Sequence, residues 1–155
     1  MDNNACRQLE IKDEYTANAH MGDLLTEVFE VQDTLQSAYG FEYNPDIRIG
    51  RLMTYLNVQH HALQDELREF FNAVGGVDTN GAAAWKNWKK EFMITQEKKL
   101  SDLSEGELLE LQFEVIDMFK FWLNMAMAVG VDAQTFYNLF MSKTRENYDR
   151  IKRGY

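Results

Sequence analysis

Two pairs of acidic residues have a spacing that could bind metal ions. Glu66 and Glu69 form an ExxE pair, and Glu114 and Asp117 form an ExxD pair. Residues three positions apart on a helix project from nearly the same side, so each pair can direct two carboxylates at one point. Two such helices packed together would gather four carboxylates, whose repulsion requires bound cations. Oxygen ligands of this kind suit Mg²⁺ or Mn²⁺, so the pattern predicts a metal site.

The second pair belongs to a longer acidic stripe. Around the axis of the predicted helix, four acids fall within about 80°: Glu107, Glu110, Glu114 and Asp117. Leu111 and Phe121 lie in or beside the same stripe, on the side expected to face the core. Acids on an apolar face need cations or bases opposite them. An ExxE pair alone is also common on solvated helix flanks, and that alternative stays open for the first pair.

Basic residues that could bind phosphates occur in two places. Residues 82–93, AAAWKNWKKEFM, put three lysines beside two tryptophans: Trp85, Lys86, Trp88, Lys89 and Lys90. The last predicted helix is basic in its second half, with Lys143, Arg145, Arg150, Lys152 and Arg153. Both patterns have simpler explanations, because lysine stems can lie along a buried tryptophan and cations stabilise any helix C-terminus. The alternative to these explanations is a set of contacts to an anionic substrate.

The elements that must position these residues are helices. Apolar residues recur at three- and four-residue spacing, and a single proline, Pro45, interrupts the chain. The pattern predicts helices over residues 23–38, 48–74, 82–93, 104–129 and 133–152. Ser104 and Glu107 form a capping box, and Asp132 can cap the last helix. We therefore predict one all-α domain over residues 1–155, in which residues 1–20 form a weak helix or a flexible arm.

Composition excludes several classes of protein. A net charge of −9 argues against broad nucleic-acid binding, which usually requires a basic surface. The chain has no apolar run long enough to span a bilayer, and its N-terminal residues do not resemble a signal peptide. The single cysteine, Cys6, fits a reducing compartment. These features predict a cytoplasmic protein with no membrane partner.

The order of the motifs resembles a known family. Glu66-Leu-Arg-Glu69, the Trp-Lys segment and Glu114-Val-Ile-Asp117 are followed by a tail with Lys143, Asn147, Arg150, Gly154 and Tyr155. This set is similar to the dimeric (type II) dUTPases of the all-α NTP pyrophosphatase (MazG-like) superfamily. Residues 31–36, VQDTLQ, also look like the helix that contacts the base in that family. The resemblance covers most of residues 24–155.

The resemblance implies a four- to five-helix bundle that forms a homodimer and hydrolyses dUTP to dUMP and pyrophosphate. It implies two or more Mg²⁺ ions held by the catalytic residues Glu66, Glu69, Glu114 and Asp117. It also implies a set of substrate-binding residues: Gln32, Gln36, Trp85, Lys86, Lys89, Lys143, Asn147, Arg150 and Tyr155. For the base that takes a proton from water, we expect Glu66, with Glu110 as the alternative.

Two residues depart from the family pattern, and both concern recognition of the nucleobase rather than metal binding. Gln36 stands where the family usually has a smaller Asn or Asp, and Lys120 stands where His is common. Base recognition depends on a few placed polar groups, so dCTP or a purine dNTP is the alternative substrate. A third hypothesis is a helical interaction protein without enzymatic activity, whose acids and lysines are surface charges.

Overall fold

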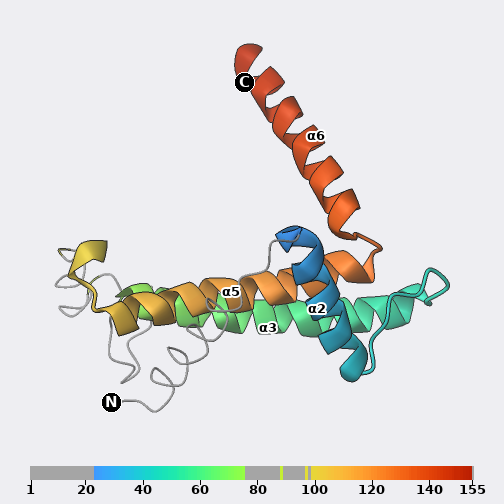
Figure 1. The fold of residues 1–155 in the computed structure, drawn as a ribbon, viewed down its shortest axis with the longest axis horizontal. Helices are drawn as coiled ribbons and strands as arrows, with labels where there is room; N and C mark the ends of the chain where they lie inside the picture. Colours follow the sequence, from blue (N-terminus) through green and yellow to red (C-terminus); the bar gives the residue numbers. More distant parts are fainter. Residues whose placement is uncertain (1–22, 76–87, 89–96, 98, 155) are drawn as a thin grey trace. The chain divides into compact units, whose positions relative to one another are not determined.

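A computed structural model describes residues 23–75, 88, 97 and 99–154. These residues form four α-helices and one short 3₁₀ helix, with no strand among them (Figure 1). The elements are α2 (Leu24–Ala38), α3 (Ile49–Gly75), η1 (Leu100–Asp102), α5 (Glu105–Ala128) and α6 (Ala133–Lys152). The all-α prediction is confirmed. None of the helices in the described ranges is long and apolar enough to span a bilayer.

Four of the five predicted helices are found within about one residue of their expected ends. The fifth, predicted over residues 82–93, lies outside the described residues except for Trp88, which is in a turn and largely exposed. The arm predicted at residues 1–20 also lies outside the described residues.

The helix ends follow from local chemistry. At the start of α2, the Asp23 carboxylate accepts hydrogen bonds from the backbone N–H groups of Leu25 and Thr26. At the start of α6, Asp132 accepts one from Thr135 N–H at 2.7 Å. Gly130 follows α5 with a φ of 83°, in the left-handed region that glycine adopts without strain. Short polar side chains and glycines therefore set the helix ends that the sequence predicts.

The described residues divide into two compact units that alternate along the chain. The first contains residues 57–122, and the second contains residues 23–56 and 123–154. The prediction of a single domain over residues 1–155 stays a prediction.

The first unit holds residues 57–75 of α3 and residues 105–122 of α5, which run side by side (Figure 1). Leu109 of α5 is buried here. This pairing brings the ExxE motif of α3 and the ExxD motif of α5 onto neighbouring helices of the same unit.

In the second unit, α2 packs against α6. The rings of Phe29 and Phe136 meet with their centroids 6.0 Å apart. Leu123 and Ala128, at the end of α5, are the most buried apolar residues of the unit. Three amide side chains are buried in the same unit: Gln32, Gln36 and Asn124. Its interior is therefore partly polar.

The capping box of α5 gives a test of local stability. The Ser104 hydroxyl and backbone N–H both donate to Glu107 Oε2, at 2.7 and 2.8 Å, and Glu107 N–H donates back to Ser104 Oγ. Replacing Ser104 by Ala removes the side-chain acceptor of Glu107 N–H and the hydroxyl donor to Glu107 Oε2, and losing such a cap typically costs about 1 kcal/mol. We expect Ser104→Ala to lower the free energy of unfolding by about that amount, measured by urea denaturation. The exposed Ser101→Ala is the control, and an equal loss in both variants would contradict the capping role.

Candidate metal centre

Three of the four predicted carboxylates converge in the first unit. Glu66 and Glu69 project from α3, and Glu114 projects from α5. Each offers a carboxylate oxygen, and these three oxygens lie within 4.8 Å of one another. We call Glu66, Glu69 and Glu114 the carboxylate cluster. Its ligand atoms, all hard oxygens from two helices, fit a divalent cation such as Mg²⁺ or Mn²⁺.

Asp117, the fourth predicted ligand, is not one of these three. Its carboxylate forms an ion pair with Lys120 Nζ at 3.4 Å, and both side chains are nearly half exposed. It still lies close enough for its charge to raise the pKa of Glu66. Exposed ion pairs of this kind contribute little free energy, so Lys120 is an easily displaced partner.

Glu114 carries the clearest sign that the cluster is incomplete by itself. Among the described side chains, its Oε2 is the one buried polar atom that has no hydrogen-bond partner. A buried carboxylate oxygen without a partner destabilises the folded state, because its hydrogen bonds to water are lost and no hydrogen bond within the protein replaces them. A cation bound to this oxygen would remove the penalty. The donor set and the unsatisfied oxygen therefore both fit a bound metal ion.

Burial and mutual repulsion also change the acidity of the cluster. Burial, followed by the charges of Glu69, Glu66, Glu110 and Asp117, raises the pKa of Glu114 to about 7. Burial is also the largest cause of the raised pKa of Glu66, with Asp117 next. Without a cation, the protein thus holds protons in the cluster at a pH where isolated glutamates are ionised.

The predicted acidic stripe of α5 separates into two parts. Glu107 is engaged at the N-terminus of α5 by the capping box, so it is not part of the carboxylate cluster. Glu110 is partly buried, and its charge raises the pKa of Glu114. Glu110 thus lies one turn before the carboxylate cluster and acts on it by its charge, whereas Glu107 in the first turn stabilises the helix end.

The predicted phosphate-binding residues are described only in part. Lys143, Asn147 and Arg150 are exposed on α6, in the second unit. Arg150 Nε donates to Glu146 Oε1 at 3.1 Å, and an Arg153 Nη atom donates to the same oxygen at 2.9 Å. The other four predicted contacts lie outside the described residues: Trp85, Lys86, Lys89 and Tyr155.

The predicted base-contacting residues Gln32 and Gln36 are buried in the second unit and have partners that the sequence analysis missed. Gln32 Nε2 donates to Asn124 Oδ1 at 2.7 Å, and the Tyr55 hydroxyl donates to Gln36 Oε1 at 2.7 Å. Asn124 left a signal in the sequence, since it is a polar residue within the apolar end of α5, FWLNMAMA. Nothing in the sequence around Tyr55 distinguishes it from other residues of a helix.

Similar proteins are found in bacteriophages. The dCTP pyrophosphatase of Enterobacteria phage LZ5 is 38% identical over 109 residues, which make up 68% of this chain and 63% of that protein. The dCTP pyrophosphatase of Enterobacteria phage T4 is 30% identical over 130 residues, which make up 81% of this chain and 76% of that protein. The chain belongs to the dCTP pyrophosphatase family.

The match thus spans slightly less than two thirds of the LZ5 dCTP pyrophosphatase and about three quarters of the T4 dCTP pyrophosphatase. A DNA replication protein of phage T4 is 29% identical over 120 residues, which are 74% of this chain but 31% of that longer protein. No protein-family model and no solved structure matches the chain.

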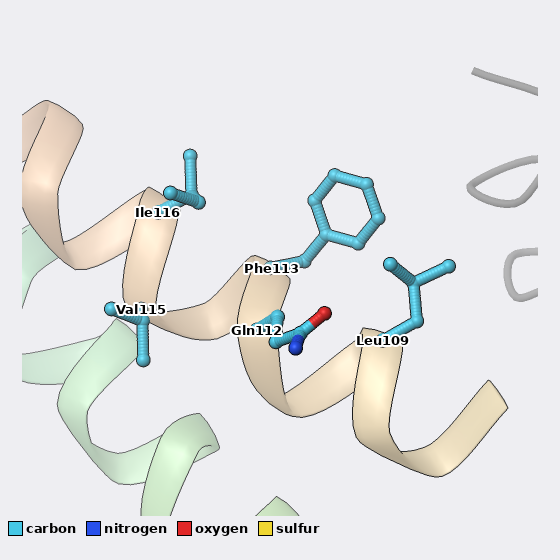
Figure 2. A pocket seen from close by; sticks show the side chains of 5 residues that line it. All are labelled: Leu109, Gln112, Phe113, Val115 and Ile116. Atoms are coloured by element: carbon cyan, nitrogen blue, oxygen red, sulfur yellow. The ribbon is translucent and has the colours of Figure 1, made fainter. Parts of the chain in front are cut away.

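The surface of α5 also has a hollow whose described lining includes no residue of the carboxylate cluster. Its volume is about 460 Å³, and its lining consists of Leu109, Gln112, Phe113, Val115 and Ile116. Figure 2 shows the side chains of Leu109 and Phe113 extending to the same side of the helix. No carboxylate is among these described lining residues, so the hollow is an apolar surface rather than a metal site.

The raised pKa of Glu114 predicts how the metal-free protein responds to pH. In the unfolded chain this glutamate titrates near 4.5, whereas its folded pKa is about 7. Between these values the folded state binds more protons than the unfolded state, so stability falls as pH rises. We expect the Tm in the presence of a chelator to decrease from pH 5 to pH 8. Glu114→Gln should flatten this dependence, and an equally steep decrease in that variant would show that another group is responsible.

Proposed function

We propose that the chain is a metal-dependent dNTP pyrophosphohydrolase whose preferred substrate is dCTP. The reaction is the attack of water on the triphosphate, which breaks the phosphoanhydride bond between the α- and β-phosphates and gives dCMP and pyrophosphate. The observation that carries the proposal is the convergence of carboxylate oxygens of Glu66, Glu69 and Glu114, together with the buried Oε2 of Glu114, which has no partner among the described residues. Membership of the dCTP pyrophosphatase family supports the same reaction.

Mg²⁺ is the proposed metal, with Mn²⁺ as a substitute. The carboxylate cluster would hold it, and Asp117 would add a ligand by exchanging Lys120 for the cation. When bound, the metal neutralises charge on the polyphosphate and lowers the pKa of water. The role of the protein residues is to hold these carboxylates at one place on two neighbouring helices.

The proton of the attacking water must pass to a base. Glu66 and Glu110 are the two candidates from the sequence. Glu66 belongs to the carboxylate cluster, and a carboxylate that binds a cation is a weaker base. Glu110 is outside the three converging oxygens but near enough to Glu114 to raise its pKa. This arrangement favours Glu110 as the proton acceptor.

Cytosine is the proposed base because both dCTP pyrophosphatases named above carry that specificity in their names. Of the substrates predicted from the sequence, dCTP is therefore better supported than dUTP. The phosphates are proposed to contact Lys86, Lys89, Lys143, Asn147 and Arg150, with Trp85 and Tyr155 as further substrate contacts.

A homodimer remains part of the proposal. Several large apolar side chains of α6 are exposed, among them Tyr137, Leu139, Phe140 and Met141. A second copy of the chain that covered this face would remove apolar surface from water.

Removing one carboxylate of the cluster should stop the reaction. Glu114→Gln keeps the size of the side chain but removes a charged metal ligand, so we expect pyrophosphate release from dCTP to fall at least 100-fold at saturating Mg²⁺. Pyrophosphate release from dCTP, dUTP, dATP and dGTP, each measured alone, checks both the reaction and the base preference. Glu30→Gln, an exposed change on α2, is the matched control and should keep full activity. Near-normal turnover by Glu114→Gln would exclude the metal assignment.

Metal and nucleotide should stabilise the folded protein together. A ligand that binds only the folded state raises its stability, and a cation that bridges carboxylates to phosphates couples the two binding events. We expect Mg²⁺ with a non-hydrolysable dCTP analogue to raise the Tm by more than the sum of the separate increases. In Glu114→Gln this excess should disappear. An interaction protein with ordinary surface charges would show no excess in either form.

A further inference from the structure

Helix α2 has an exposed apolar stripe that is separate from its buried side. The buried side holds Phe29, whereas five apolar residues on another side are between 39% and 78% exposed. We call these five residues the α2 stripe: Leu24, Val28, Val31, Leu35 and Tyr39. At about 100° per residue they fall within about 80° of the helix circumference. The stripe is therefore one continuous apolar face.

Helix α6 has a second exposed stripe, and none of its 20 residues is buried. The α6 stripe falls within about 100° of the circumference and is between 48% and 70% exposed. Its members are Tyr137, Phe140, Met141, Tyr148 and Ile151. A helix of this length is marginal in water unless one of its faces packs against other structure. The α6 stripe is the face that such a partner would cover.

The two stripes of one copy do not cover each other. Within one copy, α2 and α6 meet through the rings of Phe29 and Phe136, and neither ring belongs to a stripe. The stripe residues of both helices stay exposed in this arrangement. A partner for them must therefore come from another molecule.

The two stripes match each other in spacing and in length. Positions on the stripe side alternate every four and three residues, from Leu24 to Leu35 on α2 and from Tyr137 to Ile151 on α6, where Thr144 takes one of the positions. Each stripe is about 20 Å long at a rise of 1.5 Å per residue. Alternation of this kind allows the side chains of two helices to interlock. Each helix is thus a fitting partner for the other.

Charge also favours the pairing of α2 with α6. Helix α2 carries Glu27, Glu30 and Asp33 and no basic residue, whereas the second half of α6 is basic. Glu27 lies directly beside the α2 stripe, and Arg145 lies directly beside the α6 stripe. Among the described residues, neither of these two forms an ion pair within one copy. Pairing of α2 with α2, or of α6 with α6, would instead bring like charges together.

We propose that two copies of the chain associate reciprocally, with α2 of each copy packed against α6 of its partner. Two-fold symmetry forms this contact twice and covers both stripes of both copies. When the two helices run in the same direction with their stripes aligned, Glu27 faces the partner's Arg145. This inference rests on the homodimer of the proposed function and identifies its faces, but it does not depend on the substrate. Because α6 has no buried residue in a single copy, its helix is stable only in the dimer.

The first test introduces a charge into the α2 stripe of the full-length chain. Val31→Lys puts an ammonium group into the apolar contact, opposite a basic helix and twice in each dimer. We expect the dissociation constant of the dimer, measured by analytical ultracentrifugation, to rise at least about 100-fold. Asp33→Lys, a larger change of charge on the opposite side of α2, is the matched control and should stay within about 3-fold of wild type.

The second test identifies which helices pair. Glu27→Arg and Arg145→Glu each place like charges opposite each other, so each should weaken the dimer by about 3- to 10-fold. The double variant restores opposite charges and should return to within about 2-fold of wild type. Pairing of like helices would give no such rescue. These variants leave both stripes intact, so they test the proposal even where Val31→Lys does not fold.

The dimer and the helix should also be lost together. Dilution of the wild-type chain below the dissociation constant should reduce its helical circular dichroism, because α6 loses its partner. An unchanged helical signal on dissociation would contradict the dependence of α6 on the second copy.

Several results would overturn the proposal. A wild-type chain that stays monomeric would show that another protein covers the stripes, and a dimer that none of the charge changes weakens would use another face. Pyrophosphate release from dCTP in either case would leave the proposed reaction standing. Conversely, a dimer that responds as expected but hydrolyses no dNTP would support this pairing and remove the proposed reaction.

Discussion

The mutual repulsion of Glu66, Glu69 and Glu114 is the constraint on which the rest of the structure depends. Three carboxylate oxygens within 4.8 Å cannot all be ionised in a partly buried place without a large free-energy cost. In the metal-free protein the pKa of Glu114 is raised, so this carboxyl group keeps a proton that reduces the repulsion. A divalent ion would replace that proton and allow every carboxylate to ionise. The cluster is therefore a site whose charge state depends on what binds there.

Holding such a cluster requires rigid supports that are stabilised elsewhere. Its members come from α3 and α5, which are 27 and 24 residues long and each supply ligands from a position well inside the helix. Backbone hydrogen bonds on both sides of these positions restrict the motion of the Cα atoms that carry the three side chains. Two nearby acids have partners outside the cluster, because Glu107 accepts hydrogen bonds from Ser104 and Asp117 forms an ion pair with Lys120. The charges of Asp117 and Glu110 still add to the repulsion at Glu114.

The sequence predicts the helices well because their ends depend on nearby residues. Asp23, Ser104 and Asp132 each bond to backbone groups within three positions, so the signals and their effects are in the same short segment. The carboxylate pairs are equally local, since their spacing follows from helix geometry. The ion pair between Asp117 and Lys120 was not predicted. The spacing of the acids indicates a metal ligand at Asp117, but it does not show that a lysine one turn away can bind the same carboxylate.

The bond between Tyr55 and Gln36 could not be predicted because it joins residues 19 positions apart on different helices. Its existence depends on how α2 and α3 pack within the second unit, and packing depends on many weak contacts at once. The same reasoning explains why the sequence alone leaves the base preference open between dUTP and dCTP. Phosphates and metals are recognised by charge, which residue types reveal directly. Cytosine and uracil differ in which atoms donate and which accept hydrogen bonds, so their discrimination depends on the placement of a few polar groups, which residue types alone do not reveal.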